Sequence, residues 1–140
     1  MIVVDTNILA ALLLPTPETD NAEAVLVRDP EWFSPPLWRS ELRNVLANLI
    51  REQRLELAQA FGVMEQAEIL LIDREVEPPN LDVLQLSAKT RCTAYDCEFV
   101  AVARQLGIPL VTLDRQILRA FPDTAVSLHS FLADYPDLSG

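Results

Sequence analysis

Short, uninterrupted apolar runs along the chain predict buried strands. The run at residues 2–4 is β-branched throughout, which is typical of a strand covered on both faces. It ends abruptly at Asp5, and the run over residues 108–114 also ends on a carboxylate, Asp114. Three shorter strands are expected, at residues 32–34, at the edge position 74–77 within a charged, proline-containing connection, and at 125–128.

Segments in which apolar residues recur with helical spacing separate these strands. They predict helices over residues 8–14, 20–27, 37–52, 55–71, 81–90, 94–106 and 115–120, followed by a terminal helical turn. Asp5 or Thr6 is expected to cap the first helix, and Asp20 the second. Gly62 breaks the fourth pattern, and Gly107 stops the sixth. Strands alternating with helices predict an α/β fold, with a mostly parallel sheet covered by helices on both faces.

Length and composition indicate one domain over residues 1–140. The chain is 50% hydrophobic, enough for a substantial core at 140 residues. Its first residues lack the basic region and small-residue cleavage site of a secretory signal, and no apolar run is long enough to span a bilayer. We therefore expect a cytoplasmic protein that does not insert into membranes.

Cysteine and histidine are too sparse to build a soft metal site. Cys92 and Cys97 are the only cysteines and lie five residues apart, unlike the CxxC spacing of zinc and redox sites. We interpret them as reduced, partly buried thiols. His129 is the only histidine, and its place in the last apolar run predicts a surface or capping role. The pattern argues against histidine-based chemistry.

The formal net charge of −10 argues against casual nucleic-acid binding, because an acidic surface repels phosphate backbones at long range. Three interpretations of the charge remain open. The excess carboxylates serve one metal site, or they form a face that complements a basic partner, or they only keep the surface soluble.

Four carboxylates occupy positions from which they could converge. Asp5 and Asp114 each follow a predicted strand, and neighbouring parallel strands bring such residues to one edge of a sheet. Asp96 shares the inward face of its helix with apolar residues at i+3, i+4 and i+7, whereas Glu98 is expected to turn outward. Glu41 lies at the edge of its helix's apolar face, with a polar track at i+3 and i+7 formed by Asn44 and Asn48.

Each carboxylate also has a simpler explanation. Asp5 and Asp114 would serve as helix N-caps, and Glu41 as a solvated residue near a helix start. Asp96 would serve as a cap or pair with Arg104 or Arg91. Four carboxylates within roughly 5 Å would instead repel by about 3 kcal/mol per pair at an effective dielectric of 20. Such a group needs a divalent cation or raised pKa values. Oxygen-only ligands favour Mg²⁺ or Mn²⁺, which typically act on phosphates.

The four carboxylates lie within four longer motifs, Val4-Asp5-Thr6-Asn7, Arg39-Ser40-Glu41-Leu42, Ala94-Tyr95-Asp96-Cys97-Glu98-Phe99-Val100-Ala101 and Leu110-Val111-Thr112-Leu113-Asp114-Arg115. In this order and spacing the motifs resemble those of the PIN-domain ribonucleases, and more narrowly those of the VapC-type toxins of type II toxin–antitoxin modules. The resemblance implies a PIN-like three-layer fold and a metal-dependent endoribonuclease. In that family a metal-activated water attacks an RNA phosphodiester and leaves a 5′-phosphate and a 3′-hydroxyl.

The resemblance also implies roles for individual residues and partners. The catalytic and metal-binding positions are filled by four acidic residues, Asp5, Glu41, Asp96 and Asp114. Supporting polar positions are matched by three more residues, Thr6, Asn7 and Thr112. The cofactor would be Mg²⁺ or Mn²⁺. The partners would be RNA, a small antitoxin with a DNA-binding domain and, since these toxins commonly dimerise, a second copy of the chain.

Basic residues near these motifs give a less definite prediction for RNA binding. Arg39 and Arg43 lie on the opposite face of the helix that carries Glu41, so they are not assigned to RNA. Arg115, beside Asp114, and Asn44 are the candidates, although a solvated arginine explains Arg115 equally well. The acidic surface also suits an antitoxin arm rich in arginine.

Other enzyme classes fit the sequence less well. Haloacid-dehalogenase-like phosphatases need a second aspartate two residues after the first, and this chain has Asn7 there. These phosphatases and receiver domains also use a lysine after a later strand. The only lysine, Lys89, lies in a helical segment. A Gly-rich phosphate loop and a serine or cysteine nucleophile also lack their motifs. The remaining alternative is a catalytically silent PIN-like module that acts through a protein partner.

Overall fold

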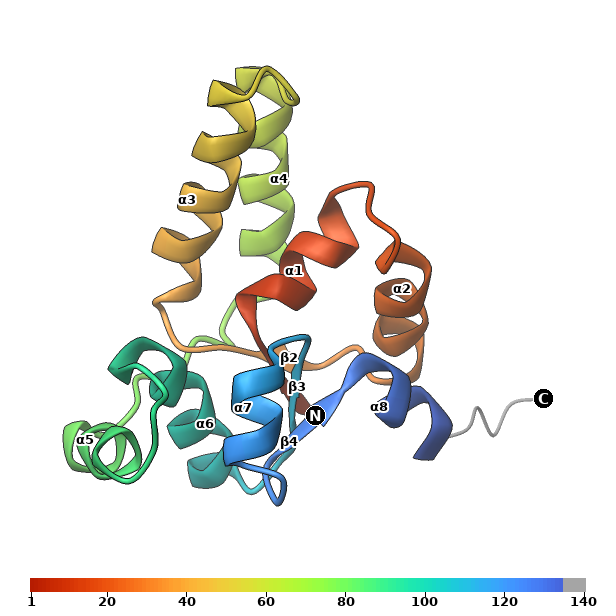
Figure 1. Ribbon diagram of the computed structural model, residues 1–140. Coiled ribbons are helices and arrows are strands. Elements are labelled where there is room, and N and C mark those ends of the chain that lie inside the picture. The colour runs from red at the N-terminus through yellow and green to blue at the C-terminus, as the bar shows by residue number, and fades with distance from the viewer. Residues whose placement is uncertain (135–140) are drawn as a thin grey trace.

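Four short strands form one parallel sheet at the centre of the computed structural model, which describes residues 1–134 (Figure 1). In space the strands follow the order β2-β1-β3-β4. Their bounds are β1 (Ile2–Val4), β2 (Trp32–Phe33), β3 (Leu110–Thr112) and β4 (Ala125–Ser127). Val3 of β1 lies opposite Phe33 on one side and Leu110 on the other. The predicted parallel sheet is confirmed.

Helices occupy every segment in which the sequence predicted one. Their bounds are α1 (Thr6–Leu13), α2 (Thr19–Arg28), α3 (Trp38–Arg51), α4 (Leu57–Leu70), α5 (Asn80–Ala88), α6 (Ala94–Leu106), α7 (Arg115–Ala120) and α8 (Leu128–Asp134). None of the helices within residues 1–134 combines the length and the apolar composition needed to cross a membrane.

The start of α2 differs from the prediction. Asp20 is not the cap: α2 begins at Thr19, and Glu18 stands at the N-cap without a side-chain hydrogen bond. The Thr19 hydroxyl lies 2.7 Å from the Ala11 carbonyl and 2.8 Å from that of Leu14, so it ties the start of α2 to the end of α1. This contact between two helices overrides the local capping preference on which the prediction rested.

Two further details depart from the sequence pattern. The edge strand expected at 74–77 is reduced to a parallel bridge between Ser34 and Glu75, because the chain pairs there with Ser34 alone, beyond the end of β2. The helix α4 continues through Gly62 without interruption. At the end of α6, Gly107 adopts a positive φ of 68° and stops the helix as expected.

Alternating residues of the strands pack against two separate helical layers. Ile2 and Val4 belong to a core cluster shared with α1, α2, α3, α4 and α8, whereas Val3 and Leu110 belong to one shared with α5, α6 and α7. Figure 1 shows α3 and α4 as a hairpin that projects away from the sheet. The two layers on opposite faces confirm the predicted three-layer α/β architecture.

The strand order fixes where ligands bind in such a sheet. From β1 the chain first adds β2 on one side, and it later adds β3 on the other. In open α/β sheets the crevice outside the carboxyl ends of two such strands is the usual ligand site. Here Asp5 follows β1 directly and Asp114 lies two residues beyond β3.

The cysteines and the histidine lie where the sequence suggested. Cys92 and Cys97 are free thiols, and both are buried in the cluster under α6. His129 is exposed on α8, with its Nε2 atom 3.5 Å from Oε2 of Glu18. Neither residue type contributes to the acidic edge of the sheet.

Candidate active site

Asp5 is a buried carboxylate whose two oxygens are both held by the protein. Its side chain is 8% exposed, because it stands between the end of β1 and the start of α1. Oδ1 accepts a hydrogen bond from the Thr6 backbone N–H at 2.7 Å, which caps α1. Oδ2 accepts one from the hydroxyl of Thr112 on β3, also at 2.7 Å. The carboxylate is therefore fixed by both central strands.

Thr6 links Asp5 to the second carboxylate. While its backbone N–H binds Asp5, its hydroxyl donates to Oε1 of Glu41 at 2.7 Å. Glu41 lies in the first turn of α3, so one threonine connects a strand end with a helix 35 residues further along the chain. Thr6 is itself buried, and its geometry orients Glu41 toward the end of β1.

Asn7 and Thr112 complete the hydrogen bonding around Asp5. The amide nitrogen of Asn7 lies 3.4 Å from Oδ2 of Asp5, and its amide oxygen accepts from the Leu113 N–H at 3.2 Å. Thr112 is fully buried, and its hydroxyl oxygen also accepts from the Asp114 N–H at 3.0 Å. These bonds join β1 to the loop after β3.

The charges of three carboxylates act on one another at this edge. Burial raises the pKa of Asp5 to about 6 against hydrogen bonds that lower it, and the charges of Glu41 and Asp96 raise it further. The pKa of Glu41 is likewise raised, first by burial and then by the charge of Asp96. Asp96 lies half-buried in the first turn of α6, where its N–H binds the hydroxyl of the Thr93 cap. Asp5, Glu41 and Asp96 therefore form one acidic group, called here the acidic centre.

Asp114 lies at the margin of the acidic centre. Its Oδ1 atom accepts hydrogen bonds from the N–H groups of Gln116 and Ile117. Asp114 is therefore the N-cap of α7, which was the alternative to a metal-binding role. Its connection to Asp5 runs through Thr112, whose hydroxyl contacts both residues. The structure thus brings three of the four predicted carboxylates into one electrostatic group and places the fourth beside them.

The donors of the acidic centre are chemically suited to a hard divalent cation. They are carboxylate oxygens from three separate elements, and no imidazole or thiolate is among them. Within residues 1–134 no three acidic, cysteine or histidine side chains are arranged so that they could hold an ion as they stand. Asp5 and Glu41 instead direct oxygens to Thr6 and Thr112.

Glu98 is a nearby acidic residue that the sequence analysis misplaced. It was expected to face outward, but it is only partly exposed and its pKa is raised, first by burial and then by the charges of Glu77 and Glu41. Glu77 and Glu98 line one pocket next to the start of α5. The sequence pattern predicts a connection with an edge strand at 74–77 before α5, and nothing in it indicates that Glu77 lies near Glu98 of α6.

The other predicted positions lie around the acidic centre. Asn44 is exposed one helical turn beyond Glu41, and Arg115 is exposed at the first residue of α7. Arg39 points elsewhere, as predicted, since its guanidinium pairs with Glu75 at 2.6 Å and with Glu68 at 2.9 Å.

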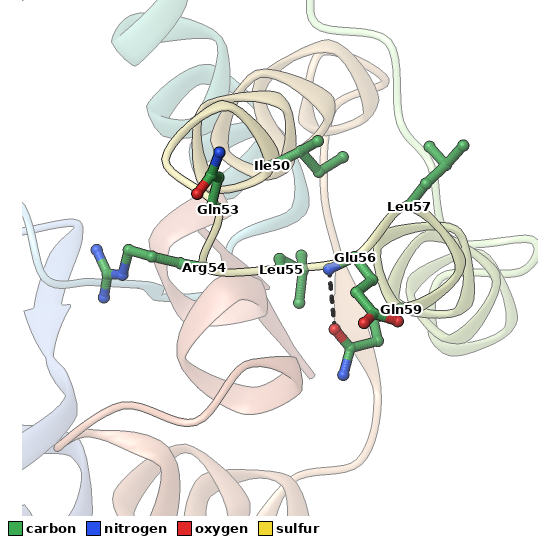
Figure 2. A pocket seen from close by; sticks show the side chains of 7 residues that line it. All are labelled: Ile50, Gln53, Arg54, Leu55, Glu56, Leu57 and Gln59. Atoms are coloured by element: carbon green, nitrogen blue, oxygen red, sulfur yellow. Dashed lines mark hydrogen bonds between the residues drawn. The ribbon is translucent and has the colours of Figure 1, made fainter.

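A pocket at the tip of the α3–α4 hairpin is separate from the acidic centre. Figure 2 shows its lining, in which the side chain of Gln59 accepts a hydrogen bond from the Glu56 N–H at 2.9 Å. That bond belongs to the capping box that begins α4. The lining starts at Ile50, nine residues after Glu41 and therefore about 14 Å further along α3. The pocket contributes no residue to the acidic centre.

Comparison with protein families matches residues 2–122 to the PIN domain. The chain belongs to the PIN domain family. Among curated PIN-domain relatives, Ribonuclease VapC3 of Pyrobaculum aerophilum is 30% identical over 134 residues, covering 86% of this chain and 95% of the relative. The family to which the sequence motifs pointed is thereby confirmed.

Solved structures of similar chains agree with this membership. The crystal structure of PAE2754 from Pyrobaculum aerophilum superposes with a TM-score of 0.72 at 25% identity, covering 96% of this chain and 95% of that one. FitAcB from Neisseria gonorrhoeae gives a TM-score of 0.69 at 21% identity, covering 92% and 99%. FitAB bound to an IR36 DNA fragment gives 0.68 at 21% identity, covering 91% and 95%. These structures share the PIN fold with this protein.

Proposed function

We propose that this PIN-domain protein is a metal-dependent endoribonuclease and the toxin component of a type II toxin–antitoxin system. One observation carries the proposal: Asp5, Glu41 and Asp96 form a single acidic centre at the switch point of the sheet, in a chain 30% identical to a ribonuclease VapC3. Since the proposed substrate is RNA, we expect the protein to act in the cytoplasm.

We further propose that the acidic centre, with Asp114 at its margin, holds Mg²⁺ or Mn²⁺. Burial and mutual repulsion raise the pKa values of Asp5 and Glu41, which means that their ionised forms are destabilised. A bound cation at this edge would stabilise the ionised carboxylates. Hard oxygen donors suit both ions. When bound, a cation of this kind activates water and neutralises charge on phosphate oxygens.

The residues around the carboxylates prepare the acidic centre for that role. Hydrogen bonds from Thr112 and from the Thr6 N–H lower the pKa of Asp5 against the effect of burial, so most molecules carry an ionised Asp5 above pH 7. The hydroxyl of Thr6 fixes Glu41, and Asn7 braces Asp5 against the loop after β3. Binding of a cation would therefore require these carboxylates to turn oxygens from Thr6 and Thr112 toward the ion.

RNA cleavage by variants of the acidic centre tests the proposal. We expect the purified protein to cut RNA with Mg²⁺ or Mn²⁺ but not with EDTA, and to leave 5′-phosphate and 3′-hydroxyl ends. Asp5→Asn and Asp96→Asn should each abolish cleavage. The control is Asp123→Asn, which removes an exposed carboxylate paired with Arg104 and should leave activity unchanged. Full activity in either Asp5→Asn or Asp96→Asn would refute the assignment. Cation binding without any RNA cleavage would instead favour the silent binding module.

The surface of the protein supports proposed protein partners. Three large apolar side chains are exposed along α4, at Leu57, Phe61 and Ile69, and the chain has a net charge of −10. Exposed apolar groups in acidic surroundings suit a partner with apolar and arginine-rich segments. We propose that this partner is an antitoxin with a DNA-binding domain, and that the toxin also forms a homodimer.

Two measurements test these partners. Replacing the arginines of the antitoxin arm should weaken the complex, and the loss should shrink as salt is raised, because exposed charges are screened. Equal affinity before and after the replacement would contradict the electrostatic part. Light scattering on the toxin alone should give twice the mass of the chain, and a monomer at micromolar concentration would contradict the dimer.

A further inference from the structure

Two basic residues lie next to the segments that carry Asp96 and Asp114, in an otherwise acidic protein. Arg91 stands two residues before the Thr93 cap of α6, and Arg115 is the first residue of α7. Both are exposed, and neither forms an ion pair with a residue in the described range 1–134. Exposed cations without acidic partners are available to bind phosphate.

A hydrogen bond joins the two segments of the chain that carry these cations. The side-chain amide of Gln116 donates to the Arg91 carbonyl at 3.2 Å, which joins the loop before α6 to the first turn of α7. The thiol of Cys92, the next residue, has its pKa raised by burial first and then by the charges of both Asp96 and Asp114. Arg91 and Arg115 therefore lie close to the carboxylates on this side of the acidic centre.

Tyr95 places an aromatic ring in the same region. Its side chain is 63% exposed in the first turn of α6, directly before Asp96. Among the aromatic residues of the described chain, only Phe61, on α4, is exposed to a similar degree, at 64%. A solvent-exposed ring next to cations is the combination with which proteins bind unpaired bases, because every base has a face that can stack.

We propose that Arg91, Tyr95 and Arg115 form a subsite for single-stranded RNA beside the acidic centre, called here the Tyr95 subsite. A base next to the cleaved phosphate stacks on Tyr95, and the flanking phosphates contact the two arginines. The inference rests on the proposed ribonuclease function and deepens it, because it names an unpaired strand as the substrate. Bases within a duplex are already stacked on their neighbours and cannot reach the ring.

Local charge favours RNA over an acidic protein segment at this position. The two carboxylates next to the Tyr95 subsite, Asp96 and Asp114, are among those proposed to face a divalent cation, which would leave Arg91 and Arg115 uncompensated. A strand reaching the acidic centre with its phosphate must pass close to them. An acidic peptide has no group that gains from the exposed ring in the same way.

Binding of RNA to variants of the Tyr95 subsite tests the inference. The variants are all made in the Asp5→Asn background, in which the RNA stays intact and no variant holds the proposed cation, so that their Kd values can be compared with one another. A labelled single-stranded RNA of mixed sequence is titrated by fluorescence anisotropy. We expect Tyr95→Ala to raise the Kd about tenfold and Tyr95→Phe to leave it within about twofold. Arg91→Ala and Arg115→Ala should each lower the slope of log K against log salt by about 0.7.

The controls separate the subsite from general effects of charge. Arg54→Ala removes an equal charge at the hairpin tip, where Figure 2 shows the arginine, and should leave the Kd unchanged. A duplex RNA of the same sequence should not distinguish Tyr95→Ala from the parent. In the active background, Tyr95→Ala should raise KM more than it lowers kcat.

Each contrary result has a distinct meaning. An unchanged Kd for Tyr95→Ala, in a protein whose active form cleaves RNA, refutes the Tyr95 subsite and leaves the proposed function intact. Absence of both RNA binding and RNA cleavage refutes the two together. If the variants keep their RNA affinity but bind the antitoxin more weakly, the surface belongs to the protein partner and the inference is wrong.

Discussion

Replacing Asp5 by asparagine should stabilise the metal-free protein at alkaline pH. The pKa of Asp5 rises from 3.8 to about 6 in the folded protein, mainly because the carboxyl is buried. A shift of about two units corresponds to about 3 kcal/mol. Because the folded pKa is raised, this stabilising contribution is complete below about pH 4 and is lost as the pH rises through 6. Above pH 7 the ionised Asp5 therefore weakens the fold.

Asparagine removes the charge while keeping most of the local geometry. It is as good an N-cap as aspartate, so the bond from the Thr6 N–H is retained. The amide nitrogen cannot accept the hydroxyl of Thr112, and this costs about 1 kcal/mol. We expect Asp5→Asn to gain about 2 kcal/mol at pH 8 and to lose about 1 kcal/mol at pH 4.

Urea unfolding followed by circular dichroism, in EDTA at pH 4 and pH 8, measures both values. Asp123→Asn is the matched control, since Asp123 is exposed and its substitution should change stability little at either pH. Addition of Mg²⁺ should stabilise the parent protein more than Asp5→Asn, because a cation that binds only the folded state raises its stability. An equal loss of stability for Asp5→Asn at both pH values would refute the reasoning.

Three further substitutions test other parts of the structure. Thr112→Val removes the hydroxyl that donates to Asp5, so it should raise the pKa of Asp5 and move the acid limb of the pH–activity profile to higher pH. An acid limb at the same pH would show that this hydrogen bond does not set the pKa of Asp5. The hydrogen bond to Arg39 lowers the pKa of Glu75, so it stabilises the fold above about pH 4.5 and this stabilisation is lost as the pH falls. Glu75→Gln should therefore make the free energy of unfolding depend less on pH on the acid side. An unchanged pH dependence would count against the ion pair. Gly107→Ala places a side chain at a φ of 68° and should cost about 1 kcal/mol in chemical denaturation, whereas no loss would mean that the backbone relaxes there.

The sequence predicted those parts of the fold in which local pattern and tertiary packing agree. The apolar runs at β1 and β3 and the stop at Gly107 depend on neighbours in the chain, and the structure confirms them. The cap of α2 was predicted wrongly because the contact that decides it, from Thr19 to the end of α1, joins two helices. The strand at 74–77 shrank to one bridge, since pairing depends on a partner strand that the pattern cannot identify.

In the candidate site too, the sequence predicted the features that depend on local pattern and missed those that depend on contacts between distant segments. Asp5 and Asp114 were found because each interrupts an apolar pattern at a strand end, and Asp96 because it shares a helix face with core residues. The cap that Asp5 forms with the Thr6 N–H was predicted, because it depends on adjacent residues. The hydrogen bond from the Thr6 hydroxyl to Glu41 joins residues 35 positions apart and left no trace in the spacing. The neighbourhood of Glu98 was missed because Glu77, whose charge raises the pKa of Glu98, lies 21 positions earlier in a predicted edge strand that the pattern does not relate to α6.

A crystal soaked in Mn²⁺ and measured for anomalous scattering tests most directly whether carboxylates from separate segments share one ion. We predict an anomalous peak within about 2.2 Å of carboxylate oxygens of Asp5 and Asp96, with Glu41 beside it, and no such peak in Asp5→Asn. A strong peak elsewhere in the molecule, or the same peak in Asp5→Asn, would contradict the proposed metal centre.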